Sequence, residues 1–340
     1  MIIKKVGLNL PTDLEKTTHY TTHAELVCKN LIELIPKNAI LVEPFVGQGD
    51  LVALFPDHIW EIYDINSTYP GVIQQDTLLN PPDYSDKWVI TNPPFLARNK
   101  AQNKILFDRY NLDDLYKIAL NTVLNADGGL FIIPTNFFTD ERSGEIRRKF
   151  LSNFIIDKIN IFTIPVFDST TYSVCAFVFH KAINTKQEIS ISIYPENKHT
   201  IITIAEEYDY RIAGDFYASL DTQENYFGRL TATTTNNITK LKLYALDTRT
   251  EKIHITYGED PYVGKNTDRV YLTFTTDKVL NEDIQKRLCE NFNNTLTAFR
   301  NKYYDLGMTN YRDYNRKRIG FNFAYKLLSR ELDLILQGEN

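Results

Sequence analysis

The chain of 340 residues has few cysteines, scattered histidines and no long apolar run. Cys28, Cys175 and Cys289 are far apart in the sequence, which excludes the paired spacing of a disulfide framework or a zinc site. The six histidines are equally dispersed, so we expect no bound metal. No apolar run approaches membrane-spanning length, and the first residues lack the apolar stretch of a secretion signal. We therefore expect a cytoplasmic protein with no membrane partner.

The sequence also lacks a strong net charge, which is −5 at neutral pH. This value argues mildly against a nucleic-acid partner, but the charges are unevenly distributed. Between residues 286 and 330, ten basic residues stand against three acidic ones, a local excess of seven positive charges. Local clusters, more than total charge, determine affinity for phosphates. Two interpretations remain open at this point: a solvated basic helix face, and a surface that binds nucleic acid.

The first half of the chain alternates strand and helix signals. Apolar patterns predict helices at residues 25–35, 51–55 and 112–124. Short apolar runs between and after them predict strands at residues 39–42, 59–63, 72–73, 88–91, 130–133, 155–162 and 172–179. Such alternation predicts an α/β fold with a parallel, doubly wound sheet covered on both faces.

The pattern changes after about residue 183. Strand-like segments with polar alternation occur at residues 189–193, 200–204, 253–257 and 270–275, and helices are expected at 281–303 and after residue 321. The segment 231–237 is polar and is expected to be an exposed loop. We therefore expect a boundary near Ala182, with one domain over residues 1–182 and a smaller α+β domain over residues 183–340.

The most informative stretch is Asn92-Pro93-Pro94-Phe95, which follows the apolar run at residues 88–91. The two prolines hold the backbone rigid and extended at the end of a buried strand. The Asn92 side-chain oxygen, beside the Pro93 carbonyl, suits the acceptance of both hydrogens of a planar amino group. The ring of Phe95 can stack on the flat molecule that carries this amine. The alternative is an ordinary proline-rich loop.

A glycine-containing turn follows the first predicted strand. Gly47 and Gly49 allow the backbone to approach a ligand closely, and the next helix presents free N–H groups. The dinucleotide-binding fingerprint requires a third glycine where this chain has Val52. Glu43, inside the turn, would disfavour a pyrophosphate and favours a ligand with a positively charged end.

Two further acidic residues end the next two strands. A carboxylate at Asp64 can accept hydrogen bonds from two ribose hydroxyls, and Ile65 can cover a purine face. Asp76 is placed to accept a hydrogen bond from an adenine amino group. Together with Glu43 and the glycines, these residues imply a ligand with a ribose, an adenine and a cationic group, which is S-adenosylmethionine.

With these residues the chain resembles the N6-adenine-specific (amino) DNA methyltransferases of Type II restriction-modification systems. In the class it resembles, cofactor motifs precede the NPPF motif and a C-terminal target-recognition domain follows. The resemblance covers residues 17–182 and rests on residues 41–49, 63–65, 75–76, 91–95, 128–134 and 166–167, with Tyr20-Thr21-Thr22 upstream. Gln48-Gly49-Asp50 departs from it, because many relatives have smaller residues there, and this puts the cofactor geometry in question.

The resemblance implies a Rossmann-like, class I S-adenosylmethionine-dependent methyltransferase sheet. It also implies that the target adenine flips out of the DNA duplex and that its N6 attacks the methyl group. The implied catalytic residues are Asn92 and Pro93, which accept the N–H groups, and Phe95 and Phe167, which stack on the base. The implied cofactor-binding residues are Tyr20, Thr21, Thr22, Glu43, Phe45, Gly47, Gly49, Asp64, Ile65, Asp76 and Asn92.

Double-stranded DNA is the implied partner. Arg98 and Lys100, just after the tetrapeptide, are candidates for contacts with the target-strand backbone, and a solvated loop is the equal alternative. In the second domain, Arg312, Arg316, Lys317 and Arg318 alternate with tyrosines in a strip suited to phosphates or bases. The resemblance extends weakly to methylases of short palindromes such as CATG. The recognition site and a cognate restriction endonuclease that acts separately remain open.

Other functions share the tetrapeptide. RNA adenine methyltransferases and protein glutamine amide methyltransferases also act on a planar nitrogen. By resemblance, however, the glutamine methyltransferases carry their extra domain ahead of the cofactor motifs. Relatives that act on cytosine N4 tend to carry Ser or Asp in place of Asn92. A nucleic-acid-binding module with a degenerate methylase fold is the non-enzyme alternative, which the presence of Asn92 and the three acidic residues opposes.

Overall fold

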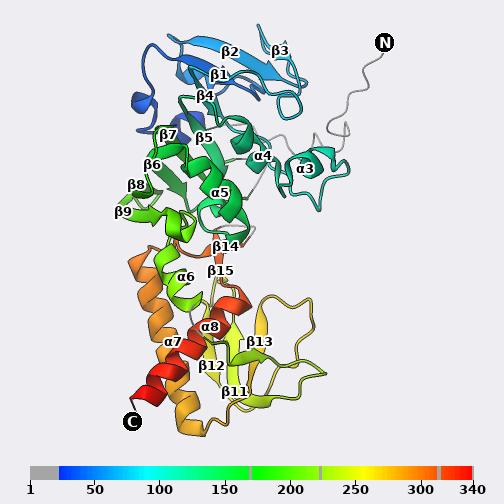
Figure 1. Ribbon diagram of the computed structural model, residues 1–340, viewed down its shortest axis with the longest axis vertical. Helices are drawn as coiled ribbons and strands as arrows, with labels where there is room; N and C mark the ends of the chain where they lie inside the picture. Colours follow the sequence, from blue (N-terminus) through cyan, green and yellow to red (C-terminus); the bar gives the residue numbers. More distant parts are fainter. Residues whose placement is uncertain (1–22, 168–170, 222–223, 312–314, 339–340) are drawn as a thin grey trace. The chain divides into compact units, whose positions relative to one another are not determined.

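The computed structural model describes residues 23–167, 171–221, 224–311 and 315–338. The chain divides into two compact units (Figure 1). Unit 1 comprises Met1–Arg211 with Arg312–Asn315, and unit 2 comprises Ile212–Tyr311 with Arg316–Asn340. Within the described residues, no helix combines the length and the apolar character needed to span a bilayer.

Unit 1 is built on a nine-stranded sheet with the order β3-β2-β1-β4-β5-β7-β6-β8-β9. The five strands from β3 to β5 are parallel, and β7 runs antiparallel to both β5 and β6. The strands are β1 (Ile40–Glu43), β2 (Ile59–Asp64), β3 (Ile73–Gln74), β4 (Lys87–Thr91), β5 (Gly128–Pro134), β6 (Phe154–Phe162), β7 (Val174–Lys181), β8 (Lys186–Tyr194) and β9 (Lys198–Ala205). The predicted α/β class is confirmed, and the seven strands expected before residue 182 are all present.

The strand order reverses between β1 and β4, which lie side by side although β2 and β3 come between them in the chain. In open α/β sheets, ligands bind beyond the carboxyl ends of the strands at such a switch point. The residues that follow β1, β2, β3 and β4 therefore meet at the edge of the sheet where a ligand site is expected.

A core of phenylalanines fixes the middle of the sheet. Phe131, Phe150, Phe177 and Phe179 are fully buried, and the Phe150 and Phe179 rings lie 4.9 Å apart in an edge-to-face arrangement. These rings come from β5, β7 and helix α5 (Gly144–Leu151). The cluster explains why both strands consist almost wholly of apolar residues, since their side chains are buried on both faces of the sheet.

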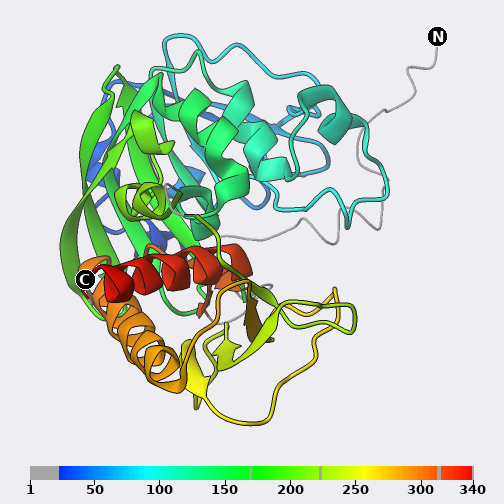
Figure 2. The same cartoon turned by 60° about the horizontal axis from the view of Figure 1, so that its bottom comes forward.

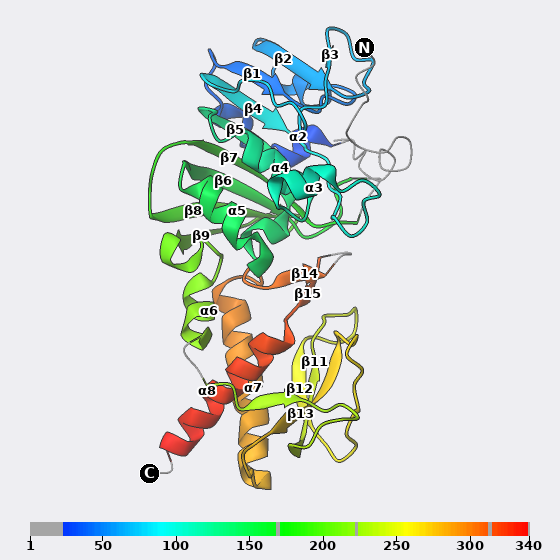
Figure 3. The same cartoon turned by 45° about the vertical axis from the view of Figure 1, so that its right-hand side comes forward.

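Helices α3 (Ile105–Tyr110), α4 (Leu115–Thr122) and α5 lie on one face of the sheet (Figures 2 and 3). The helix expected at residues 25–35 is instead two short pieces, α2 (Ala24–Val27) and the 3-10 turn η1 (Ile32–Leu34). Asn30 between them has a positive φ of 57°, which a continuous helix does not allow. The helix expected at residues 51–55 is only the 3-10 turn η2 (Val52–Leu54), because Pro56 follows it.

Unit 1 extends beyond the boundary expected near Ala182. Strand β8 pairs parallel with β6, and β9 pairs antiparallel with β8, so the division falls after Arg211. The apolar residues of β8, such as Ile189 and Ile191, are buried while Glu188 and Ser190 are exposed. The change to polar alternation therefore marks the part of the same sheet that is covered on one face only. It does not mark the start of a new domain.

Unit 2 contains a four-stranded antiparallel sheet with the order β10-β13-β11-β12. Its strands are β10 (Phe227–Arg229), β11 (Asn237–Tyr244), β12 (His254–Tyr257) and β13 (Tyr271–Thr276), and its helices are α6 (Gly214–Asp221), α7 (Glu282–Lys302) and α8 (Phe321–Gln337). Figure 2 shows α7 in orange and α8 in red. A hairpin of β14 (Thr309–Tyr311) and β15 (Arg316–Arg318) precedes α8. The expected helices at 281–303 and after 321 are confirmed. Asn281 begins α7 because its side chain accepts a hydrogen bond from the Ile284 amide.

Candidate active site

The turn after β1 is held by backbone groups and by a carboxylate from the next strand. Gly47 and Gly49 both have positive φ, 52° and 86°, a conformation that glycine adopts without steric cost. The Gly47 amide donates to the Asp64 Oδ2 atom at 3.0 Å, and its carbonyl accepts from the Ser67 hydroxyl at 2.6 Å. The two glycines are therefore required by the turn itself, whatever ligand it receives.

Asp64, at the end of β2, organises two loops at once. Besides the Gly47 amide, its carboxylate accepts hydrogen bonds from the amides of Asn66 and Ser67, at 2.8 and 2.9 Å. A carboxylate offers about four acceptor positions, so these bonds leave capacity for a ligand hydroxyl beside the structural role.

The ring of Tyr69 lies directly against Gly49. A Cβ atom placed on Gly49 would come within 2.0 Å of the Tyr69 Cε2 atom. The Tyr69 amide donates to the Ser67 hydroxyl at 2.9 Å, so the same loop that binds Gly47 also brings the ring over Gly49. The absence of a side chain at residue 49 is therefore a packing requirement as well as a conformational one.

The turn after β3 is tied to the turn after β1. Asp76 accepts hydrogen bonds from the amides of Leu78 and Leu79, at 3.2 and 3.0 Å, and burial raises its pKa. The neighbouring Thr77 hydroxyl donates to the Pro44 carbonyl at 3.0 Å. Asp76 is thus held at the same sheet edge as Glu43 and Asp64, as the sequence predicts.

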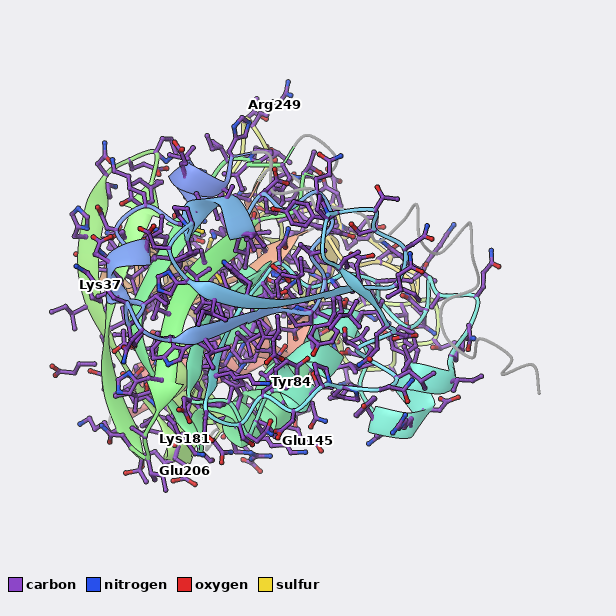
Figure 4. The ribbon with its side chains drawn as sticks, turned by 90° about the horizontal axis from the view of Figure 1, so that it is seen from above. Lys37, Tyr84, Glu145, Lys181, Glu206 and Arg249 are labelled. Carbon is purple, nitrogen blue, oxygen red and sulfur yellow. The ribbon has the colours of Figure 1, made fainter. Side chains whose placement is uncertain are left out.

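Glu43 connects the cofactor turn with the strand that leads into the tetrapeptide. Its side chain is 2% exposed, and its Oε1 atom accepts from the Phe45 amide at 3.0 Å and from the Thr91 hydroxyl at 2.6 Å. Burial raises the pKa of Glu43 to about 8, and the nearby Asp64 carboxylate also raises it, while the two hydrogen bonds oppose the shift. Tyr84, which is labelled in Figure 4, is 1% exposed and interacts electrostatically with Glu43.

Replacing Glu43 with glutamine is expected to change how stability depends on pH. Glu43 would ionise near its ordinary value of 4.5 in the unfolded chain but only near 8 in the folded protein. The folded state then holds a proton that the unfolded state has lost, so stability falls as pH rises from about 4.5 to 8. Glutamine keeps the acceptor oxygen without the titration, so Glu43→Gln should gain on the order of 2–4 kcal/mol over the wild type between pH 5 and pH 8.

Urea unfolding of both proteins at several pH values measures this difference. Glu33 is an exposed glutamate of unit 1 and provides the control variant Glu33→Gln. Its free energy of unfolding, plotted against pH, should run parallel to that of the wild type. Parallel curves for Glu43→Gln would contradict the expected titration.

Asn92-Pro93-Pro94-Phe95 begins where β4 ends. Asn92 is half-buried, whereas Pro93 and Phe95 are buried. The ring of Phe95 meets the ring of Tyr116 edge to face, with centroids 6.2 Å apart. Only 4% of Phe95 is exposed, so little of this ring is accessible to a stacked base unless the loop moves.

The segment after the tetrapeptide is fixed to the start of α4. The Leu96 amide donates to the Asp114 Oδ1 atom at 3.1 Å, and the Arg98 amide donates to the Asp113 carbonyl at 2.8 Å. Ala97 and Asp114 form an isolated antiparallel bridge. Burial raises the pKa of Asp114 to about 7, the neighbouring Asp113 raises it further, and Lys117 lowers it.

The structure thus brings together most of the residues predicted for the site. Glu43 and Asp64 end β1 and β2, and Gly47, Gly49 and Asp76 lie in the turns that follow β1 and β3. Direct hydrogen bonds join these segments, and Asn92 follows the strand joined to Glu43. Phe45 and Ile65 are half-buried in the same turns. Phe167 is 4% exposed and lies after β6. Tyr20, Thr21, Thr22 and Arg312 lie outside the described residues.

The predicted DNA-binding residues have different surroundings. Arg98 is exposed and forms an ion pair with Asp108, and the Lys100 ammonium group donates to the Tyr172 hydroxyl at 2.9 Å. In the hairpin of unit 2, Arg316 and Arg318 are half-buried, while Lys317 between them is 5% exposed. The Lys317 ammonium group donates to the Asn310 side chain at 2.6 Å. Because Lys317 is buried, it is a weaker candidate for phosphate contact than the two arginines.

The basic stretch at residues 286–330 is less positive in the folded unit 2 than in the sequence. Five of its cations pair with acidic residues that lie outside the stretch. These pairs are Arg287 with Asp283, Arg300 with Asp247, Lys302 with Asp215, Lys326 with Asp221, and Arg330 with Glu331. A count along the sequence overlooks these acids because most of them come from α6 and from the loop after β11.

Sequence reasoning missed Thr91, Asp114 and Tyr69. The Thr91–Glu43 contact joins residues 48 positions apart, so no local pattern indicates it. Asp114 lies in the first turn of the helix predicted at residues 112–124, where an acidic residue is usual and attracts no notice. The turn Tyr69-Pro70-Gly71 signals a loop, but the target of its ring is visible only in three dimensions. Among the described residues, no group of three or more His, Cys, Asp or Glu side chains is arranged to hold a metal ion.

No protein-family model and no curated protein matches the chain. Several solved structures resemble it. A modification subunit of a putative type I restriction enzyme from Vibrio vulnificus is 13% identical, with a TM-score of 0.44, over 60% of this chain and 52% of that one. The methyltransferase subunit of a type I restriction-modification system from Streptococcus thermophilus is 14% identical, with a TM-score of 0.41, over 52% of this chain and 47% of that one.

The type IIL restriction-modification enzyme MmeI, solved in complex with DNA, is 12% identical, with a TM-score of 0.44, over 71% of this chain and 47% of that one. The chain therefore spans about half the length of these three proteins. Likeness at this level does not determine activity, which depends on the residues at the site.

Proposed function

We propose that the protein transfers a methyl group from S-adenosylmethionine to adenine N6 in a short sequence of double-stranded DNA. The observation that carries the proposal is the continuous set of hydrogen bonds from the turn after β3, through Pro44 and Glu43, to Thr91. With the bond from the Gly47 amide to Asp64, they gather three carboxyl groups, a glycine turn and the Asn92 loop at one edge of the sheet. That edge is where an open α/β sheet binds its ligands.

Each group at this edge suits one part of the cofactor. Asp64 would receive the ribose hydroxyls, Asp76 the adenine amino group, and Ile65 would cover the purine face. Glu43 lies where the cationic end of the ligand is expected, and a positive charge beside it would favour its ionised form. When bound, S-adenosylmethionine supplies an electrophilic methyl group on a sulfonium.

The residues of the tetrapeptide would act on the target amine. Adenine N6 is a weak nucleophile because its lone pair is delocalised into the ring. If the Asn92 side-chain oxygen and the Pro93 carbonyl each accept one N–H, the nitrogen becomes more tetrahedral and its lone pair becomes available for attack. The prolines keep these two acceptors in a fixed geometry, so the contribution of the protein is positioning and electrostatic stabilisation.

Unit 2 would hold the DNA duplex in this proposal. Arg316 and Arg318 flank the buried Lys317 on a two-stranded hairpin, and arginine binds phosphates and guanine edges through paired N–H groups. Because the adenine must leave the helix before methylation, the proposal includes base flipping.

Incubation of the purified protein with S-adenosylmethionine and unmethylated genomic DNA tests the proposal. Base-resolved sequencing should find N6-methyladenine within one short motif. Methylation at cytosine N4 would mean that the target base is cytosine. Methyl label found only in RNA or in protein would mean that the substrate is not DNA. Absence of both methylation and S-adenosylmethionine binding would favour a degenerate binding module instead.

A further inference from the structure

The Asn92–Phe95 loop has few backbone donors of its own. Pro93 and Pro94 have no N–H to donate, so the tetrapeptide lacks two of the donors that normally fix a loop to its surroundings. Contacts made by the residues on either side therefore contribute to the precision required of Asn92 and Pro93. A misplacement of about 1 Å in a reacting group can cost 100-fold in rate.

On the amino-terminal side, the contact is the hydrogen bond from the Thr91 hydroxyl to the Glu43 Oε1 atom at 2.6 Å. Thr91 is fully buried and is the last residue of β4. Successive side chains of a strand point to opposite faces, so a fixed Thr91 side chain also fixes the direction in which the chain leaves towards Asn92. The same Glu43 oxygen accepts the Phe45 amide, which ties this end to the glycine turn.

On the carboxyl-terminal side, the contact is the hydrogen bond from the Leu96 amide to the Asp114 Oδ1 atom at 3.1 Å. Leu96 also accepts a hydrogen bond from the Leu115 amide at 3.3 Å, so the segment is held from both of its backbone groups. Asp114 directly precedes α4, whose Tyr116 ring contacts Phe95. The end of the loop is thereby attached to a buried helix.

We infer that Thr91 and Asp114 are positioning residues that hold the Asn92–Phe95 loop from its two ends, Thr91 through Glu43 and Asp114 through the Leu96 amide. This inference rests on the proposed methyl transfer. Neither side chain needs to touch the substrate or the cofactor. Removal of either contact should leave both ligands bound and should slow the chemical step.

Two pairs of variants test the inference. Thr91→Val removes the hydroxyl at nearly constant volume, while Thr91→Ser retains it. Asp114→Ala removes the acceptor for the Leu96 amide, while Asp114→Asn retains an acceptor oxygen. We expect kcat for DNA methylation to fall about 10- to 100-fold in Thr91→Val and Asp114→Ala. KM for S-adenosylmethionine and for DNA should stay within about threefold of the wild-type values, since no ligand contact is lost.

The conservative variants Thr91→Ser and Asp114→Asn should recover kcat to within about threefold of the wild type. A kcat unchanged in Thr91→Val and Asp114→Ala would overturn the inference, as would Thr91→Ser no more active than Thr91→Val. If Asp114→Ala fails to fold, the threonine pair still decides the question.

Hydrogen exchange separates a failure of this inference from a failure of the proposed function. Peptides that cover residues 96–98 should exchange faster in Asp114→Ala than in Asp114→Asn, whatever the activity of the protein. A wild-type protein that methylates no DNA would refute the proposed function alone, and equal exchange in the two variants would refute the role of Asp114.

Discussion

Replacing Asn92 with alanine is expected to lower the rate of methyl transfer by about 100- to 1,000-fold, the loss typical of removing one preorganised hydrogen-bond group at a reacting centre. The variant loses the side-chain acceptor for one N–H of the target amine, so the nitrogen lone pair stays delocalised. S-adenosylmethionine binding should change much less, because the turns after β1, β2 and β3 hold their own hydrogen bonds. Single-turnover methylation and calorimetric titration of S-adenosylmethionine measure the two effects separately.

Asn99→Ala is the matched control for this experiment. Asn99 has the same side chain and lies exposed in the same loop, seven positions after Asn92. Its removal should leave the rate unchanged. If Asn92→Ala retained the wild-type rate, Asn92 could not be the acceptor, and the assigned reaction would have to be abandoned.

The proximity of the candidate site residues could be predicted from the sequence because these residues stand at strand ends. Buried parallel strands are short apolar runs, and the polar residue after each run is easy to recognise. Asp64 and Asn92 follow such runs directly, and Glu43 ends the first strand. Since the carboxyl ends of neighbouring parallel strands meet at one edge, their proximity followed from topology alone.

The sequence failed where contacts join distant segments. Thr91 reaches Glu43 across 48 positions, and Asp114 reaches Leu96 across 18. The same reason explains the basic stretch, whose Arg300 pairs with Asp247, 53 positions away. Charge summed over a window measures what the chain carries locally, whereas the surface potential depends on which residues the fold brings together.

Asp64 illustrates how a residue with a predicted ligand role can also have a structural one. Its three hydrogen bonds to backbone amides would keep the glycine turn in shape before any cofactor arrives. A turn that is already in its binding conformation costs less ordering entropy when the ligand binds. The carboxylate is therefore expected to contribute to affinity through the shape of the turn as well as through the ribose hydroxyls.

Replacing Gly49 with alanine is expected to disrupt this turn more than replacing Gly71. Both glycines have a positive φ, 86° and 81°, so alanine is strained to a similar degree at either position, by about 1–2 kcal/mol. They differ in their surroundings. A Cβ atom at residue 49 would meet the Tyr69 ring at 2.0 Å, whereas the nearest atom to a Cβ at residue 71 is the Ile62 Cδ1 atom at 4.0 Å.

The comparison of the two variants therefore isolates the contact with Tyr69. We expect Gly71→Ala to lose only the folding stability that backbone strain costs, about 1–2 kcal/mol. Gly49→Ala should lose about 2–4 kcal/mol of folding stability in total. Gly49→Ala should also bind S-adenosylmethionine at least about tenfold more weakly, because the displaced ring and the glycine turn share the Ser67 hydrogen bonds. Thermal unfolding and calorimetric titration measure both quantities.

The double variant Gly49→Ala/Tyr69→Ala completes the test. Without the ring, the added methyl group has room, so the cost of Gly49→Ala measured in the Tyr69→Ala background should fall to that of Gly71→Ala. A cost that stays the same in both backgrounds would show that the ring is not what residue 49 must accommodate. Because Tyr69 belongs to the loop that Asp64 holds against Gly47, the cycle also measures how strongly the loops after β1 and β2 depend on each other.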